Sequence, residues 1–482
     1  MNYTNSEIVV PKHDQTMLSI KGSNKEPLNL NTFLEQPTRA LESTIHLENQ
    51  ENRESNARSY PRRIPLALTR GQGIFLQDTE QQVFIDGLAA AGTLALGHSH
   101  PEIAETITQT LNSGVPLQTL DITTPVKEEF IDSLFQLLPA NIAKQARVQF
   151  CSPCGADAVE AAIKLAKTAT GRNTILAFSG AYHGMTQGTL SIMGNLGPKS
   201  AIGAIVPDVQ FMPYPYAPRC PYGLGEDGVK ASLNQLETML TDPESGVLKP
   251  AAIILEAVQG EAGAIPADNE WLKGLRKLTQ KHGILLIVDE VQAGMGRTGE
   301  IFAFEHAGIE PDIIVLSKAI GGGLPMAVIV YKSEIDLWKP GAHAGTFRGN
   351  QLALASGRVV MRHLLEEKLH LHARDMGARL KNHLAKIKSP LVGNVRGRGL
   401  MLGVEIVNPL AEKDGLGQYP VDGERARAIQ QEALKLGLIV ELGGRFGSTI
   451  RLLPPLIITG EEVDTIAERL AEAIDIITLK TT

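Results

Sequence analysis

The sequence is poor in the residues that build disulfide scaffolds and basic, nucleic-acid-binding surfaces. It has 482 residues but only 3 cysteines and 2 tryptophans, and 5% of its residues are aromatic. Three cysteines in so long a chain exclude a disulfide framework. The 46 lysines and arginines are outnumbered by 53 aspartates and glutamates, and the formal net charge of −7 disfavours a polyanionic partner such as nucleic acid.

Long hydrophobic runs are also missing. No apolar run approaches the roughly 20 residues that a membrane span needs. The longest runs, such as 283–288 and 328–331, have the length of a strand. The first residues, MNYTNSEIVVPKHDQT, lack the charged start and the apolar core of a signal peptide. We therefore expect a cytoplasmic protein without membrane contact.

The composition that remains is that of a globular protein, with 43% hydrophobic residues and 47 glycines. A chain of this length exceeds the size at which one core stops growing, so we expect several domains. Residues 1–50 are polar and weakly patterned, and we interpret them as an arm that is partly disordered or lies on a partner. Residues 51–100 contain two strands around a turn at Asp78–Thr79, and we expect this segment to pack with a smaller domain.

Helical patterns alternate with short buried strands over residues 101–345, the predicted large domain. The six predicted strands are Val148–Cys151, Thr174–Phe178, Ala252–Glu256, Leu285–Asp289, Ile313–Ser317 and Ala327–Tyr331. This alternation is typical of the α/β class, with a doubly wound and mostly parallel sheet. Residues 346–482 carry a long helical segment and then a mixed α+β pattern, which predicts a smaller C-terminal domain.

The stretch FCSPCGADAVEAAIKLA (150–166) joins the end of a predicted strand to the start of a predicted helix. Gly155 stands where this helix begins. A glycine at that position lets backbone N–H groups approach an anion, and the helix dipole adds to the attraction. The stretch therefore predicts a phosphate cradle, with a plain strand-to-helix turn as the alternative.

Cys151 and Cys154 in the same stretch leave another function class open. A Cys-x-x-Cys pair can act in thiol redox chemistry, so a thiol oxidoreductase is an alternative. No second cysteine pair and no nearby histidine cluster completes a zinc site. His98 and His100 in the motif GHSHP have no third ligand beside them in sequence, and we interpret them as turn residues. We expect no metal.

Two further strand ends carry polar residues. Asp289 ends the apolar run ILLIVD, and Lys318 follows the run IIVLS. Taken singly, Asp289 could be a helix cap and Lys318 a solvated loop lysine. Because the carboxyl ends of parallel strands meet at one edge of a sheet, both should lie beside the Gly155 cradle. An anion cradle, a carboxylate and a lysine form the set that pyridoxal phosphate requires.

Eight motifs occur in order along the chain: GHSHP (97–101), CGADAVEAAIKLA (154–166), AYHG (181–184), LEAVQGEAG (255–263), VDEVQAGMGRTG (288–299), LSKAIGGGLP (316–325), GTFRGN (345–350) and IRLLPP (450–455). In this order they resemble the class III pyridoxal-phosphate aminotransferases of fold type I. The resemblance runs from about Arg58 to Ile458. The stretch ESNARSYPR (54–62) is similar to the 2,4-diaminobutyrate 4-aminotransferase branch of that family.

The resemblance implies roles for residues at the matching positions. Lys318 would be the Schiff-base lysine and the proton shuttle, and Asp289 would pair with the ring nitrogen of pyridoxal 5'-phosphate. The other residues expected around the ring are Tyr182 stacked on it, His183 beside it, Gln292 at the phenolic oxygen and Glu256 near the lysine.

The resemblance also assigns the phosphate end of the cofactor. Gly155 and Ala156 would offer backbone N–H groups to the phosphate. Cys154 and Ala156 stand where the family often has hydroxyl side chains, so the backbone should carry more of the binding. Thr346 resembles the residue that reaches the phosphate of a neighbouring subunit, which implies an obligate homodimer with shared active sites.

For the substrates, Arg451 resembles the carboxylate-binding arginine of the family, and Glu261 resembles the acid that pairs with it. Tyr60 lies near a substrate-binding tyrosine of the family. Met185 stands where many relatives have an arginine for a distal carboxylate. Three arginines could replace it, or could equally form surface salt bridges: Arg58, Arg62 and Arg63.

The resemblance implies ping-pong transfer of the terminal amino group of L-2,4-diaminobutyrate to 2-oxoglutarate, giving L-aspartate 4-semialdehyde and L-glutamate. Ornithine, acetylornithine or 4-aminobutyrate as the amino donor, or an aminomutase reaction, are the alternatives within the family. A pyridoxal-phosphate-binding regulator is disfavoured, because the first 50 residues are too short and unpatterned for a DNA-binding module and the net charge is negative.

Overall fold

The structure is a computed structural model that describes residues 27–202 and 208–481. The first part of the predicted N-terminal arm, residues 1–26, lies outside the described residues. Among the helices that are described, none is long and apolar enough to cross a membrane.

The described part of the arm is helical. It contains α1 (Leu30–Leu34) and most of α2 (Ile45–Arg53). Each helix begins at a capping residue, because the side chains of Asn29 and Thr44 accept hydrogen bonds from backbone amides of the first turn. The weak apolar pattern of this segment gave no signal for these two helices, and the interpretation of residues 1–50 as a partly disordered or partner-bound arm stays a prediction.

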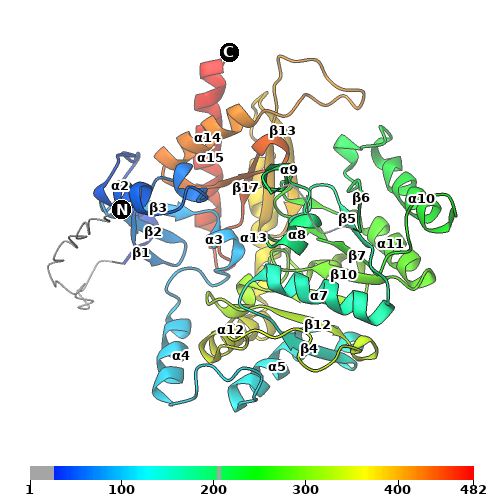
Figure 1. Ribbon diagram of the computed structural model, residues 1–482. Coiled ribbons are helices and arrows are strands. Elements are labelled where there is room, and N and C mark those ends of the chain that lie inside the picture. Colours follow the sequence, from blue (N-terminus) through cyan, green and yellow to red (C-terminus); the bar gives the residue numbers. More distant parts are fainter. Residues whose placement is uncertain (1–26, 203–207, 482) are drawn as a thin grey trace, which may run out of the picture.

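Seven strands form the largest sheet of the described residues, in the order β4-β12-β11-β10-β7-β5-β6 (Figure 1). Their bounds are β4 (Ala146–Phe150), β5 (Ile175–Phe178), β6 (Val209–Met212), β7 (Ala252–Leu255), β10 (Leu285–Asp289), β11 (Ile313–Leu316) and β12 (Val328–Lys332). The strands from β11 to β6 run parallel, whereas β12 is antiparallel to both β11 and β4. The sheet is mostly parallel, as predicted.

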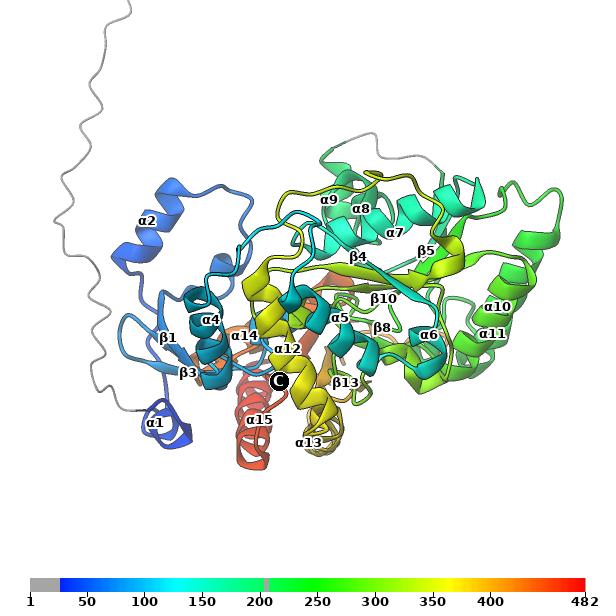
Figure 2. The same cartoon turned by 90° about the horizontal axis from the view of Figure 1, so that it is seen from below.

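Helices cover the two faces of this sheet (Figure 2). On one face, α7 (Gly155–Thr170) packs on β7, β10, β11 and β12 through a stripe of buried, mostly small apolar residues. On the other face, α5 (Pro125–Leu137) packs against α12 (Gln351–Leu365), and α10 (Gly228–Thr241) packs against α11 (Asn269–Lys281). The remaining short or peripheral helices are α3 (Ala89–Gly92), α4 (Pro101–Asn112), α6 (Ala140–Ala143), α8 (Gln187–Ser191) and α9 (Leu196–Ser200).

Two smaller four-stranded sheets accompany the large one, and the first of them combines strands from the two ends of the chain. The first has the order β1-β2-β3-β15 and contains β1 (Leu68–Gln72), β2 (Phe75–Asp78), β3 (Val83–Asp86) and β15 (Leu438–Ile439). The second is antiparallel, with the order β13-β14-β17-β16, and contains β13 (Val392–Arg398), β14 (Met401–Ile406), β17 (Thr449–Leu452) and β16 (Glu441–Gly443). A two-stranded ribbon joins β8 (Val258–Gln259) to β9 (Ile265–Pro266).

Three helices belong to the C-terminal part of the chain: α13 (Leu369–Leu384), α14 (Gly423–Lys435) and α15 (Gly460–Thr481). They pack on one another and on the smaller sheets. Because β15 pairs with β3, the N-terminal strands contact the C-terminal segment directly. The division into domains at the predicted residue boundaries stays a prediction.

Candidate active site

The structure brings the predicted strand-end residues to one edge of the large sheet. Asp289 is the last residue of β10, and Lys318 begins the 3-10 helix η5 (Lys318–Gly321) directly after β11. β10 and β11 are parallel neighbours, so their carboxyl ends lie side by side. The charges of Glu261, Asp289 and Glu256 all raise the pKa of the Lys318 amine, against the larger effect of burial.

Lys318 has an unusual backbone and an unusual charge environment. Its φ of 50° lies in the left-handed region, which side-chain-bearing residues seldom adopt. Burial lowers the pKa of its amine below the ordinary lysine value, and Glu261 opposes this effect. A lysine with a lowered pKa has more free amine near neutral pH, and the free amine is the form that attacks a carbonyl.

Asp289 is held by two hydrogen bonds. Its Oδ2 lies 2.7 Å from Nδ1 of His183, and the backbone N–H of Val291 donates to its Oδ1 at 3.0 Å. Burial opposes a charge on His183, but the bond to Asp289 and the charge of that carboxylate outweigh burial and raise the histidine pKa. The other ring nitrogen of His183 is buried without a hydrogen-bond partner.

Glu256 follows β7 and holds the backbone around the site. Its carboxylate accepts hydrogen bonds from the backbone N–H groups of Tyr182 at 2.9 Å and Gly260 at 3.0 Å. Burial raises its pKa to about 7. The Tyr182 backbone is thus fixed, while its ring is 38% exposed at the surface of the site. Glu256 therefore positions the segment that carries Tyr182.

Arg451 and Glu261 form the ion pair that the resemblance implied. The two terminal guanidinium nitrogens lie 2.8 and 2.9 Å from the two carboxylate oxygens. The Arg451 side chain is only 1% exposed, whereas that of Glu261 is 36% exposed. A Cβ on Gly443 would lie 2.7 Å from Arg451 Nε, so the glycine makes room for the arginine. The exposed partner, Glu261, is the one that can move away.

The start of α7 offers amides to an anion. Cys154 occupies the N-cap position, and its side chain makes no capping hydrogen bond. The first-turn N–H groups of a helix have no acceptor within the helix, so those of Gly155 and Ala156 suit a phosphate. A Cβ on Gly155 would lie 3.1 Å from a Val291 methyl group. Glycine thus lets the helix start lie against the strand ends, a packing reason that the sequence analysis did not give.

The two cysteines of this stretch do not act as a pair. Both are free; Cys151 is buried and Cys154 is exposed. Burial raises the pKa of the Cys151 thiol, which leaves little thiolate for redox chemistry. These features argue against the thiol oxidoreductase alternative.

Two predicted cofactor residues have less defined surroundings. The side chain of Gln292 donates from Nε2 to the carbonyl of Ala91 at 3.3 Å, and its Oε1 is buried without a partner. Thr346 is exposed in a segment that passes close to Ser152. The predicted role of Thr346 involves a second subunit and stays a prediction.

The three candidate arginines differ in their partners. Arg58 forms an ion pair with Glu51, and Arg62 donates to the side chain of Asn56, so both are tied to their own exposed segment. Arg63 instead reaches Glu441, a buried acid on β16, at 2.7 Å. Of the three, only Arg63 points to the sheet that carries Arg451.

Tyr60 contacts Arg63 and feels the charges of the Arg451–Glu261 pair. The Arg63 guanidinium stacks 5.6 Å from the centre of its ring. Burial is the largest cause that raises the pKa of the Tyr60 phenol, and the charges of Glu441 and Glu261 raise it further. Sequence analysis missed Glu441, whose only signal was an acid inside the apolar run LIVELGG.

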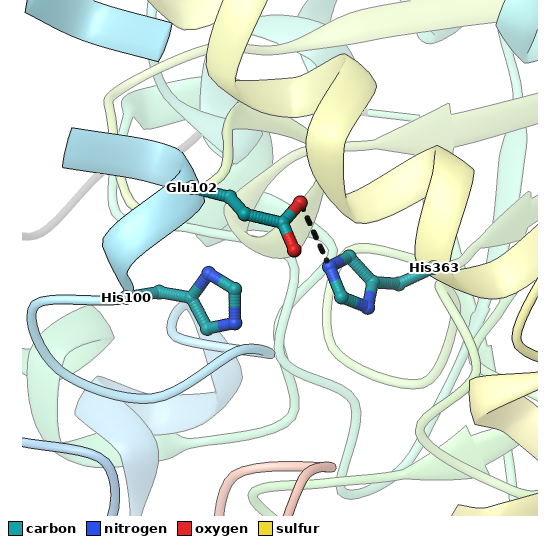
Figure 3. Close-up of side chains that lie close together, drawn as sticks. All are labelled: His100, Glu102 and His363. Carbon is teal, nitrogen blue, oxygen red and sulfur yellow. Dashed lines mark hydrogen bonds and ion pairs between the residues drawn. The ribbon is translucent and has the colours of Figure 1, made fainter. Parts of the chain in front are cut away.

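The motif GHSHP separates its two histidines. His98 bonds to Asp86 at 2.7 Å. His100 lies with Glu102 and His363, which Figure 3 shows pointing toward one another. The sequence offered no third ligand because His363 comes from the distant α12. Arg362 forms an ion pair with Glu102 at this cluster, so a side chain of the protein itself provides a positive charge beside this carboxylate.

The site residues fit pyridoxal 5'-phosphate on their chemistry. The buried oxygen of Gln292 and the buried nitrogen of His183 both lack partners, as expected for groups that face a polar ligand. Asp289 would supply the carboxylate, Lys318 the amine and the start of α7 the amides. Val291, which approaches Gly155 and bonds to Asp289, is a further member that the sequence analysis missed.

Comparisons with known proteins agree with this geometry. The family described as Aminotransferase class-III matches residues 56–474. A diaminobutyrate–2-oxoglutarate aminotransferase of Rhizobium meliloti (strain 1021) is 55% identical over 90% of this chain and 93% of its own length. One of Haemophilus influenzae is 51% identical over 90% of this chain and 96% of its own length.

Solved structures give the same family and the cofactor. A PLP-bound amine transaminase from an uncultivated Pseudomonas species has a TM-score of 0.78 and 28% identity, covering 88% of this chain and 98% of its own. An omega-transaminase from Thermomicrobium roseum has a TM-score of 0.79 and 28% identity, covering 89% of this chain and 97% of its own. The predicted fold type I architecture is confirmed, and the cofactor is pyridoxal 5'-phosphate. The chain belongs to the class III aminotransferase family.

Proposed function

We propose that this chain transfers the 4-amino group of L-2,4-diaminobutyrate to 2-oxoglutarate, giving L-aspartate 4-semialdehyde and L-glutamate by ping-pong exchange. The observation that carries the proposal is the closed Arg451–Glu261 pair beside Lys318. Relatives at 55% and 51% identity that carry the name diaminobutyrate–2-oxoglutarate aminotransferase support the choice of donor.

The residues around the cofactor would have separate roles in amino transfer. Bound pyridoxal phosphate supplies the electron sink that lets the carbon next to the amino group lose a proton. Asp289, fixed by His183 and Val291, would keep a proton on the ring nitrogen. The Lys318 Nζ, whose pKa is lowered by burial, would take the proton from that carbon as a free amine and deliver it to the cofactor carbon on the other side of the transferred nitrogen.

The two substrates make opposite demands on Arg451. Diaminobutyrate presents a terminal carbon without a carboxylate, whereas 2-oxoglutarate presents a keto carbon that carries one. An unpaired Arg451 would be a buried charge in the first half-reaction, at a cost of several kcal/mol. Glu261 neutralises it there, and swings away in the second half-reaction so that the substrate carboxylate takes its place bidentately.

This switch suits any donor with a terminal amino group, so ornithine, acetylornithine and 4-aminobutyrate remain alternatives. A regulator is less well supported, because the site holds a complete set of proton-transfer and carboxylate-binding groups. We further propose a homodimer in which Thr346 of each subunit serves the phosphate site of the other. The cytoplasmic location stays a prediction from the sequence.

The proposed donor is tested with purified holoenzyme and 2-oxoglutarate in a panel of diaminobutyrate, ornithine, acetylornithine and 4-aminobutyrate. Glutamate formation is measured for each donor as kcat/KM. We expect diaminobutyrate to exceed every other donor by at least about tenfold, a difference of 1.4 kcal/mol in transition-state binding. If any of the other three donors gives a higher kcat/KM, that compound and not diaminobutyrate is the preferred donor.

A further inference from the structure

Glu441 is a buried carboxylate that the transfer chemistry does not use. It is 1% exposed. Its Oε1 accepts a hydrogen bond from the Leu442 backbone N–H at 2.8 Å and forms an ion pair with Arg63 at 2.7 Å. Its Oε2 is equally buried and has no partner. Burial of this carboxylate is the main cause that raises its pKa. A carboxylate oxygen left unpaired in this way is costly, unless a ligand supplies the missing donor.

The position of Glu441 places it beside the Arg451–Glu261 pair. In the antiparallel pair of β16 and β17, Glu441 stands directly opposite Arg451. Directly opposed residues project to the same face of a sheet. Gly443, two residues further along β16, lies on that face and makes the space that Arg451 Nε fills. Glu441 and Arg451 therefore lie on the same face of the sheet.

Arg63 supplies the positive charge that pairs with Glu441 on this face of the sheet. Its side chain is 31% exposed, so it can change partners at lower cost than the buried Arg451. Its backbone is anchored, because its carbonyl accepts a hydrogen bond from Gln431 at 3.0 Å. Tyr60, which the charges of Glu441 and Glu261 both reach, links this pair to the Arg451–Glu261 pair.

We infer that Glu441 and Arg63 form a subsite for the α-amino acid end of the donor, in which Glu441 Oε2 accepts from the α-ammonium group and Arg63 binds the α-carboxylate. The inference rests on the proposed diaminobutyrate function. When the terminal carbon of diaminobutyrate faces Lys318, its other end carries both an ammonium group and a carboxylate. A carboxylate and a guanidinium side by side match those two charges.

The same arrangement explains how the chain would bind the distal carboxylate although Met185 stands where many relatives have an arginine. This side chain is apolar and 57% exposed, and it cannot bind a distal carboxylate. Arg58 and Arg62 have partners on their own segment, whereas the partner of Arg63 is Glu441, beside Arg451 in the neighbouring strand. In this chain the distal end of the donor would thus be bound by residues on β16 and in the segment before β1, and not by the loop that carries Met185.

The subsite predicts which donors are rejected. 4-Aminobutyrate has no α-ammonium group and would leave Glu441 Oε2 unpaired, as it is in the free enzyme. Ornithine carries the ammonium group, but one methylene farther from the reacting carbon. A site built around a polar group discriminates strongly against analogues that lack it, because its own buried group then stays unsatisfied.

The test compares Glu441→Gln with wild-type holoenzyme in single-turnover half-reactions, followed through the cofactor absorbance. We expect the apparent affinity for diaminobutyrate to fall about 10- to 100-fold, the usual effect of losing a charge-assisted hydrogen bond. The half-reactions with 4-aminobutyrate and with 2-oxoglutarate should stay within about threefold of wild type, since neither substrate has the ammonium group. Glu424→Gln, at an exposed acid on α14, is the matched control and should change nothing.

Arg63→Gln provides a second variant if Glu441→Gln loses its cofactor. It alters a partly exposed side chain, and it should weaken diaminobutyrate and 4-aminobutyrate together, because both carry the distal carboxylate. Equal losses of Glu441→Gln with diaminobutyrate and 4-aminobutyrate, or no loss with either, would overturn the subsite. If wild-type enzyme itself fails to use diaminobutyrate, the proposed function fails instead, and the two failures are thereby distinguished.

Discussion

At the residue scale, the charges around Lys318 set when its amine is free. Burial lowers the pKa of Lys318, and Glu261 is the acid that most opposes this effect. The free amine is present above the pKa, so a lowered pKa extends its reactivity to lower pH. The rate at which apoenzyme captures pyridoxal phosphate should therefore reach half its maximum below pH 10.5, the ordinary lysine value.

The same measurement on Glu261→Gln checks the sign of this effect. Removing the negative charge of Glu261 takes away the largest influence that keeps the amine protonated. The midpoint of capture should therefore move to a still lower pH, as read from the cofactor absorbance after rapid mixing. A midpoint that moves upward would contradict the assigned charge environment of Lys318.

Glu261→Ala tests the arginine switch on the substrate side. Without its partner, Arg451 stays charged and buried in the half-reaction with diaminobutyrate, which should slow at least about tenfold. The half-reaction with glutamate should be retained or improved, because Arg451 is then always free for an α-carboxylate. Single-turnover absorbance measurements separate the two halves. Equal slowing of both halves would make Glu261 a structural partner only.

At the scale of elements, the start of α7 depends on how closely it approaches the strand ends. A Cβ at Gly155 would lie 3.1 and 3.3 Å from the two methyl groups of Val291, and the larger valine side chain would push the helix start away. Gly155→Val should therefore weaken binding of pyridoxal phosphate by about 10- to 100-fold, through misplaced phosphate-binding amides. Equilibrium dialysis of apoenzyme with the cofactor measures this directly.

Cys154→Ser is the matched control at the neighbouring position. Cys154 is exposed and its side chain caps nothing, so a hydroxyl there should leave cofactor affinity unchanged or slightly stronger. Loss of affinity in this variant comparable to that of Gly155→Val would mean that the thiol takes part in binding. Unchanged cofactor affinity in Gly155→Val would mean that the backbone amides at the start of α7 do not bind the phosphate.

The elements that sequence could predict were those with a local signal. β10 has the predicted bounds, because its five residues form an uninterrupted apolar run that ends in an aspartate. β6 was missed, since it is a short edge strand with Gln210 inside its apolar pattern. The pairing of Glu441 with Arg63 was missed for a different reason. It joins residues on separate elements far apart in the chain, and no local spacing reports such a contact.

At the scale of the whole molecule, the N-terminal and C-terminal segments meet around the active site. β3 pairs with β15, and Arg63 from the N-terminal segment binds Glu441 in the adjacent β16. The proposed substrate end of the site would thus combine residues from the two ends of the chain, whereas the proposed cofactor residues lie at the edge of the large sheet. The resemblance predicts residues for both ends of the site, but only the structure shows that Arg63 is the arginine paired with Glu441.

Shared active sites are tested by mixing two inactive variants. Lys318→Ala and Thr346→Ala chains are unfolded together and refolded, or co-expressed, to form hybrid dimers. In a hybrid, the site that keeps Lys318 also receives an intact Thr346 from the other subunit. Activity should therefore return to about a quarter of the wild-type value in a random mixture, since half of the dimers are hybrids with one complete site each. No gain over the separate variants would contradict sharing.

The most direct test of terminal amino transfer follows the nitrogen itself. Wild-type holoenzyme is incubated with 2-oxoglutarate and diaminobutyrate labelled with nitrogen-15 at either the 4-amino or the 2-amino group, and the glutamate formed is analysed by mass spectrometry. Only the 4-labelled donor should yield labelled glutamate, because the closed Arg451–Glu261 pair admits the carbon that has no carboxylate. Labelled glutamate from the 2-labelled donor, or no glutamate from either, would contradict the proposed reaction.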